Sequence, residues 1–202
     1  MNKAKLVVAS GNAHKIKEIS EIFSEYEVVS QKQAGFDEDV EETGVTFMEN
    51  ALIKARAACK ALGLPVLADD SGICVNALGG APGVYSARYC GRHGDDAENR
   101  RVLLQNMQGK TDRTGYFACA VALVFPNGKE VCAEGFTYGK ILEKEEGTAG
   151  FGYDPLFFND DLQKSFGVAS AEEKNGVSHR YRALVELKKN CDKEGVILGS
   201  EF

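Results

Sequence analysis

The sequence lacks an apolar run long enough to cross a membrane, and its first ten residues lack the long apolar stretch of a secretory signal peptide. It also lacks a C-x-x-C pair, and the spacings of its six cysteines match no zinc or haem motif. Scattered single cysteines in a chain of 202 residues are typical of reduced, mostly buried thiols. We therefore expect a cytoplasmic protein with no disulfide framework and no membrane partner.

Positive charge is in deficit, because the formal net charge is −6. A surface of this sign disfavours DNA and anionic membranes as partners, so we expect no nucleic-acid partner. A small polyanion remains compatible, since local lysines, arginines and a metal can dominate one cleft. The 44% of apolar residues and 27% of charged residues are typical of a globular core. The length suits a single domain, residues 1–202, with room for two lobes.

Two adjacent aspartates, Asp69 and Asp70, stand between short apolar runs at 65–68 and 73–78. This pattern predicts a buried strand that ends in a turn at 69–72, with a second extended segment leaving the turn. Carboxylates packed side by side repel each other, and burial raises the pKa of at least one. Mg²⁺ resolves that conflict, because it prefers one or two carboxylates together with substrate phosphates. The alternative is a turn in which one aspartate caps a backbone amide.

A tight turn at 10–12 separates a strand-like run at 5–9 from a helical pattern at 13–23. The start of a helix presents free amides and the positive end of its dipole, which suits a phosphate group. Gly11 lets the backbone approach a ligand closely, and Lys15 projects from the first helical turn. The second glycine and the Lys-Ser/Thr pair of a Walker A loop are missing, so a plain connection remains the alternative.

An acidic cluster at 37–42 follows a strand predicted at 25–31. We expect most of this cluster to be a solvated loop from which one acid can reach a metal. A capping box that begins at Thr46 predicts a helix over 47–62. Lys54 falls on the apolar stripe of this helix, where it either enters a cleft or extends to solvent.

The second half of the chain predicts a helix to about residue 107 that begins near Asp95, and then a hairpin. The strands at 116–125 and 131–138 flank Pro126-Asn127-Gly128, which is a strong turn signal. A glycine-rich stretch then leads into 151–155, where two aromatic residues surround a glycine. These rings either stack on a planar ligand or pack against the core.

A final helix is predicted from Ser178, its N-cap, to about residue 189. His179 and Arg180 then lie in the first turn, where the helix dipole disfavours cations. A bound anion or carbonyl oxygen would explain them. Cations suit phosphates, acids suit Mg²⁺ and aromatic rings suit a base, so these features together predict a nucleoside triphosphate site.

The sequence also resembles the inosine/xanthosine triphosphate pyrophosphatase family. The matching segments follow the family's order from residue 7 to about residue 185. They are Ser10-Gly11-Asn12-Ala13-His14-Lys15, Phe47-Met48-Glu49-Asn50-Ala51 with Lys54-Ala55, Ala68-Asp69-Asp70-Ser71-Gly72, Gly79 to Tyr89, Phe151 to Pro155, and Glu173-Lys174-Asn175 with Ser178-His179-Arg180.

The resemblance implies an elongated, two-lobed α/β fold, with a central mixed sheet flanked by helices and an active-site cleft between the lobes. It implies a homodimer that hydrolyses non-canonical purine nucleoside triphosphates (ITP, dITP and XTP) to the monophosphate and pyrophosphate with Mg²⁺. Asp70 is the expected proton acceptor and metal ligand, with Glu41 and Asp69 as further metal contacts. The residues expected to bind phosphates and sugar are Ser10, Gly11, Asn12, Ala13, His14, Lys15, Lys54 and Ser71. Those expected at the base end are Phe151, Gly152, Tyr153, Asp154, Lys174, His179 and Arg180.

Two alternatives stay open. A purine nucleotide sensor could use the same cations and aromatic rings without catalysis. Asp69 and Asp70 argue against it, because binding alone needs no negative charge beside a triphosphate. An enzyme of similar fold could cleave pyrimidine triphosphates, which the base-end motifs disfavour.

Overall fold

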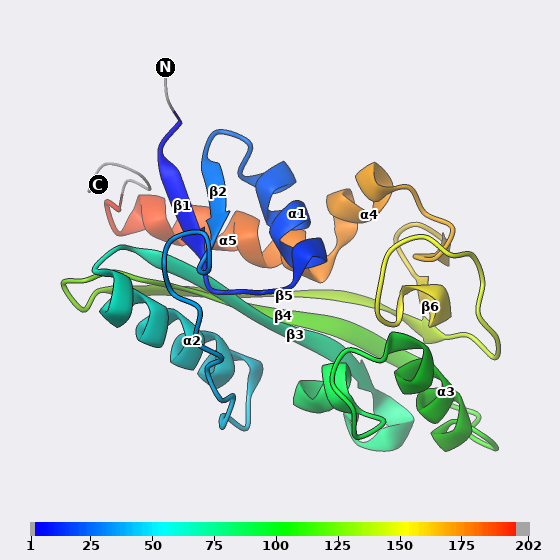
Figure 1. Cartoon of the computed structure of the whole chain (residues 1–202). Helices are drawn as coiled ribbons and strands as arrows, with labels where there is room; N and C mark the ends of the chain where they lie inside the picture. The colour runs from blue at the N-terminus through cyan, green and yellow to red at the C-terminus, as the bar shows by residue number, and fades with distance from the viewer. Residues whose placement is uncertain (1–2, 197–202) are drawn as a thin grey trace. The chain divides into compact units, whose positions relative to one another are not determined.

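The computed structural model describes residues 3–196, and these form an α/β fold in which helices flank a sheet (Figure 1). The strands are β1 (Lys5–Val8), β2 (Glu27–Ser30), β3 (Val66–Val75), β4 (Thr114–Val124), β5 (Glu130–Ile141), β6 (Phe157–Asn159) and β7 (Lys164–Ser165). The helices are α1 (Ala13–Ile22), α2 (Phe47–Leu62), α3 (Asp96–Asn106), α4 (Ala171–Val177) and α5 (His179–Lys193). The predicted α/β class is confirmed.

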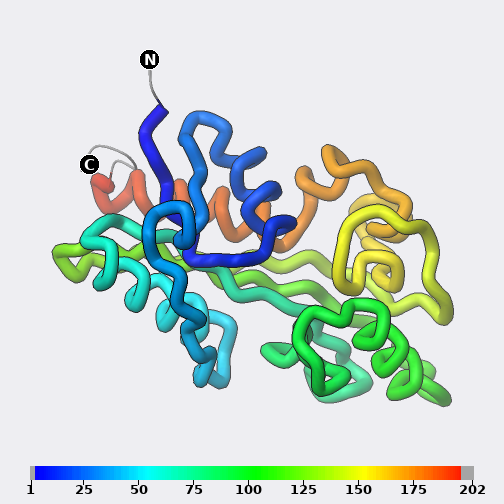
Figure 2. Tube along the Cα trace, viewed as in Figure 1, coloured from blue at the N-terminus to red at the C-terminus, as the bar shows by residue number. Residues whose placement is uncertain are grey.

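The described strands form one seven-stranded sheet in the order β2-β1-β3-β4-β5-β6-β7. β1 is parallel to both β2 and β3, whereas β6 is antiparallel to both β5 and β7. The sheet is therefore mixed, as predicted. Figure 2 shows the N-terminal part of the chain in blue, where the crossover through α1 joins the parallel strands β1 and β2.

The chain divides into two compact units. The first unit comprises the chain up to Asp70, Ala120–Glu134 and the chain from Ala183 onward; the second comprises Ser71–Cys119 and Gly135–Arg182. Strands β3, β4 and β5 and helix α5 each contribute residues to both units. The single domain and the cleft between lobes stay predictions.

The core of the first unit forms where α2 packs on parallel strands. Three consecutive residues of β1, Leu6, Val7 and Val8, are buried, as expected for a parallel strand covered on both faces. Helix α2 begins after the predicted capping box of Thr46 and Glu49, and its small residues pack against β1 and β3. The prediction of a helix over 47–62 is confirmed.

The predicted turn at 69–72 is wrong, because β3 continues without a break from Val66 to Val75. Asp69 and Asp70 lie in the middle of this strand and are buried. Their carboxylates do not end the strand because side chains from α1 and α2 compensate their charge, as described below.

The second unit has its own core, which contains buried side chains of β3, α3, β4 and β5, and its phenylalanines are Phe117, Phe157 and Phe166. Ser178 caps α5 as predicted, because its hydroxyl accepts the amide of Tyr181. Helix α4 was not predicted, although Ser170 and Glu173 form a capping box at its start. No helix among residues 3–196 combines the length and the apolar character needed to span a membrane.

Candidate active site

Asp69 and Asp70 project from opposite faces of β3, because successive side chains of a strand alternate. Asp69 is fully buried and Asp70 is 7% exposed. Burying a carboxylate without a compensating partner costs roughly several kcal/mol of folding free energy. Each of the two aspartates therefore needs partners of its own. The two carboxylates therefore differ in their surroundings although they are neighbours in sequence.

Asp69 is paired with the start of α1. The ammonium of Lys15, in the first turn of that helix, lies 3.1 Å from Asp69 Oδ2, and the Lys15 side chain is only 15% exposed. Lys54 Nζ, from α2, donates to the main-chain oxygen of Asp69 at 2.8 Å. Two lysines from two helices thus converge on one residue of β3.

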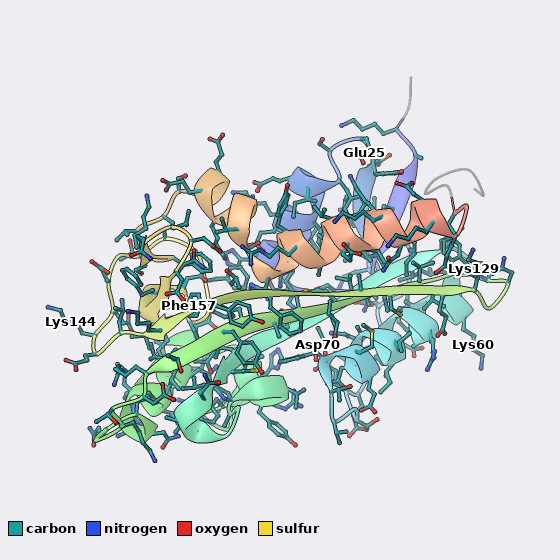
Figure 3. The ribbon with its side chains drawn as sticks, turned by 180° about the vertical axis from the view of Figure 1, so that it is seen from behind. Glu25, Lys60, Asp70, Lys129, Lys144 and Phe157 are labelled. Carbon is teal, nitrogen blue, oxygen red and sulfur yellow. The ribbon has the colours of Figure 1, made fainter. Side chains whose placement is uncertain are left out.

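Asp70 is held from α2, beside which Figure 3 labels it. Asn50 Nδ2 donates to Asp70 Oδ2 at 3.1 Å, and Asn50 is fully buried. Lys54 Nζ lies 3.9 Å from Asp70 Oδ1. Asn50 and Lys54 are four residues apart and therefore share one face of the helix.

The acidic segment before α2 is fastened to the same helix. Glu42 Oε1 lies 2.7 Å from Lys54 Nζ, and the amide of Gly44 donates to Asn50 Oδ1 at 2.8 Å. A side chain at position 44 would collide with Glu49 and Asn50, so glycine is required by this close approach. Asn50 thereby links the acidic segment to Asp70.

Burial raises the pKa of Asp70 above its ordinary value, although Lys54 and Lys15 oppose this effect. Burial also acts against the charged form of Lys54, but Asp70, Asp69 and Glu42 outweigh it and raise the pKa of Lys54. The structure therefore keeps a cation beside a carboxylate that accepts protons more readily than an exposed one.

The acids of the first unit fit a metal that takes few protein ligands. Among residues 3–196, no group of three or more His, Cys, Asp or Glu comes together as a metal site. Glu42 and Asp70 both approach Lys54, whereas the side chain of Glu41 is exposed. The carboxylates of Glu42, Asp69 and Asp70 lie around the ammonium groups of Lys15 and Lys54. Carboxylate oxygens are hard donors that suit Mg²⁺, whose coordination is typically completed by substrate phosphates and water.

The turn before α1 has the open space that a ligand requires. Asn12 caps the helix, and its Oδ1 accepts the amides of His14 at 2.9 Å and Lys15 at 3.2 Å. A Cβ at Gly11 would meet no atom of the protein within 4 Å. Packing within the protein therefore does not require glycine here. Gly11, Asn12, Ala13 and His14 are exposed.

The second unit brings several predicted base-end residues together. Lys174 Nζ lies 2.7 Å from Asp154 Oδ2, and both side chains are buried. The same carboxylate oxygen accepts the amide of Phe151 at 2.9 Å. Lys174 Nζ also lies 4.5 Å from the centre of the Phe151 ring. This cluster joins α4 to the loop before β6.

Arg180 and His179 begin α5, and both are buried. Arg180 Nη2 donates to Ser71 Oγ at 3.0 Å, and its guanidinium carbon lies 6.0 Å from the Phe151 ring centre. The His179 ring stacks on Phe117 with 4.8 Å between centres and 12° between planes. Arg180 is therefore beside Phe151, and His179 is oriented by the core.

The two aromatic residues around Gly152 have different surroundings. The Tyr153 ring lies in the core of the second unit, and its hydroxyl donates to the main-chain oxygen of Ser86 at 2.8 Å. Burial raises the pKa of that hydroxyl strongly. Phe151 is only partly buried. Phe151 is thus the aromatic side chain of this pair with surface available to a ligand.

Sequence reasoning missed Glu42 and Asn50. Asn50 belongs to the motif around Glu49 and lies one helical turn before Lys54, which was an available signal. Glu42 could not be separated from its acidic neighbours without the contact to Lys54.

Comparison with known proteins identifies the family of the chain. Residues 6–190 match the model of the Ham1 family. The dITP/XTP pyrophosphatase of Clostridium perfringens is 46% identical over 196 residues, covering 92% of this chain and 96% of that protein. The Ham1 protein structures of Staphylococcus aureus and Coxiella burnetii superpose with a TM-score of 0.85 each, at 41% and 39% identity, covering 94% of this chain and 99% of theirs. With a family match over most of its length and close relatives in sequence and fold, the chain belongs to the Ham1 family.

Proposed function

We propose that this protein hydrolyses non-canonical purine nucleoside triphosphates (ITP, dITP and XTP) to the nucleoside monophosphate and pyrophosphate, with Mg²⁺. The observation that carries the proposal is Asp70, a buried carboxylate held by Asn50 and Lys54. Relatives named dITP/XTP pyrophosphatase support the substrate class. This reaction removes such nucleotides from the cellular pool.

Asp70 is the proposed proton acceptor. A water oxygen forms a bond to the α-phosphorus, the bond from that phosphorus to the bridging oxygen breaks, and pyrophosphate leaves with the electron pair. Asp70 takes the proton that the water loses, and its raised pKa favours this. Asn50 orients the carboxylate through Oδ2.

Charge in the first unit is proposed to hold the triphosphate. Lys15 and Lys54 neutralise phosphate oxygens, with the main chain of 10–14 close to the phosphates. Phosphoryl transfer depends mainly on such positioning and neutralisation. Asp70 and Glu42 would hold Mg²⁺, which would polarise the phosphorus and neutralise the departing pyrophosphate. Asp69 and Glu41 remain predicted as further metal contacts.

The cluster around Phe151 is proposed to receive the purine base. Ser71 remains a predicted contact of the phosphates and sugar, and Phe151 offers a ring for stacking. Lys174 and Arg180 lie near the Phe151 ring. Together with His179, the neighbour of Arg180 in sequence, they are proposed to supply donors that suit a 6-keto oxygen. Adenine carries a 6-amino group there, and a site that leaves buried donors unpaired rejects its ligand strongly.

Two properties implied by the family resemblance are part of the proposal. The protein is expected to act in the cytoplasm and to form a homodimer. A sensor without catalysis and a pyrimidine triphosphatase are the competing functions, and the following experiments separate them.

The reaction type is tested with a panel of nucleotides. With Mg²⁺, the purified protein is expected to convert ITP, dITP and XTP to monophosphate and pyrophosphate, and ATP, CTP and UTP far more slowly. Chromatography of the nucleotides and a pyrophosphate assay follow the reaction, and EDTA is expected to stop it. IDP and phosphate as first products would refute the proposal, and tight ITP binding without turnover would favour the sensor.

The role of Asp70 is tested with Asp70→Asn, which keeps the size and removes the base. The rate is expected to fall by ~10²–10⁴-fold, while affinity for ITP in EDTA changes little. A near-normal kcat would assign the base to another acid.

The same variant has a predicted effect on stability. The pKa of Asp70 is raised in the folded chain above its ordinary 3.8, so the neutral form stabilises the fold at low pH and ionisation removes this stabilisation as pH rises through the folded pKa. At pH 7 the charge therefore costs stability, and Asp70→Asn is expected to unfold at an equal or higher temperature in EDTA. A clearly lower Tm would show that the charge stabilises the fold.

The role of Arg180 is tested by comparing ITP with ATP. If Arg180 binds the 6-keto oxygen, Arg180→Ala is expected to lower kcat/KM for ITP about ten- to a hundred-fold, the scale of a lost charged hydrogen bond. ATP should be affected much less. If both substrates lose equally, Arg180 contacts phosphate and the base-binding role is refuted.

A further inference from the structure

Helix α3 holds the main chain of Gly152 at two points. The amide of Gly152 donates to Asp96 Oδ2 at 2.8 Å, and its carbonyl oxygen accepts from Arg100 Nη1 at 2.8 Å. Asp96 and Arg100 are four residues apart, so they share one face of the helix. One helix therefore fixes both polar groups of a single residue, whose φ of 60° is in the left-handed region.

Gly152 lies at the centre of the loop that the proposed function assigns to the base. Phe151 precedes it, and Asp154, two residues after Gly152, accepts the Phe151 amide with its carboxylate. The approach to this loop, residues 143–150, is exposed. The contacts of Gly152 therefore help to fix the loop that carries the Phe151 ring, together with the contacts of Phe151 to Asp154 and Lys174.

Arg100 is suited to this task by its burial and by its forked head. Its side chain is only 16% exposed, and while Nη1 reaches Gly152, Nε lies 2.8 Å from Glu145 Oε1. A guanidinium donates in two directions with a fixed geometry, which lysine does not. Arg101, the next residue, is 54% exposed and pairs with Glu98 of the same helix. The chain thus supplies a matched control for Arg100.

We propose that Asp96 and Arg100 are positioning residues that determine base specificity by holding the loop of Phe151 and Asp154 through Gly152. The inference rests on the proposed function, in which that loop receives the purine base. Neither residue needs to touch the substrate. Loss of the contact should loosen the base end and leave the chemistry at Asp70 intact.

The test compares Arg100→Ala with Arg101→Ala and Glu145→Ala. Arg100→Ala is expected to raise KM for ITP about tenfold, the scale of a lost charged hydrogen bond, with kcat changed less than about threefold. The ITP/ATP ratio of kcat/KM should fall. Arg101→Ala and Glu145→Ala should match the wild type, because both keep the contact between Arg100 and Gly152. Arg100→Lys, which keeps the charge and a single donating nitrogen but loses the planar fork, should recover part of the loss.

Amide hydrogen exchange separates this inference from the proposed function. Exchange at 151–154 should be faster in Arg100→Ala than in Arg101→Ala, whether or not ITP is a substrate. If the wild type does not hydrolyse ITP, the proposed function fails while exchange still tests the contact. Unchanged exchange, or kinetics identical in the two arginine variants, would overturn the inference. If Arg100→Ala does not fold, Arg100→Gln takes its place in both measurements.

Discussion

The burial of two consecutive carboxylates in the middle of β3 is the constraint on which the first unit depends. Charged groups removed from water cost far more than one hydrogen bond returns. The chain offsets that cost from two directions, with Lys15 from α1 on Asp69 and with Lys54 and Asn50 from α2 on Asp70. The starts of both helices are consequently fixed relative to the strand. The proposed triphosphate site is thus pre-organised by the same contacts that offset the cost of burying the aspartates.

Helix α2 contributes two residues to this arrangement, Asn50 and Lys54. Asn50 accepts from Gly44 and donates to Asp70, and Lys54 pairs with Glu42 and reaches β3. Glu42 of the acidic segment is thereby placed beside Asp70, the proposed proton acceptor. Three carboxylates, those of Glu42, Asp69 and Asp70, thus lie around the ammonium groups of Lys15 and Lys54. Such a departure from a plain apolar core is typical of a functional site.

How far the sequence predicts the fold depends on whether the determining contact is local. The start of α2 follows from its capping box and its end from Gly63 and Pro65, so both ends are predicted from local sequence. The turn at 69–72 was wrong because the partners of Asp69 and Asp70 come from residues far away in sequence. Helix α4 was missed because its seven residues show no clear period.

In the candidate site, too, residues were predictable where the signal lies within one segment of the sequence. Motifs within one segment pointed to Lys15, Lys54, Asp154 and Arg180, and the structure places each in a charged or aromatic cluster. Pattern alone did not distinguish the buried Tyr153 from the partly exposed Phe151. The hold of Arg100 on Gly152 joins residues 52 positions apart, and nothing in either segment indicates it.

The central claim is that water attacks the α-phosphorus and that pyrophosphate leaves, and isotope labelling tests it most directly. ITP would be hydrolysed in water enriched in ¹⁸O, and both products would be analysed by mass spectrometry. The account predicts one ¹⁸O atom in IMP and none in pyrophosphate. Label in pyrophosphate with unlabelled IMP would place the attack on the β-phosphorus and contradict the mechanism derived from Asp70.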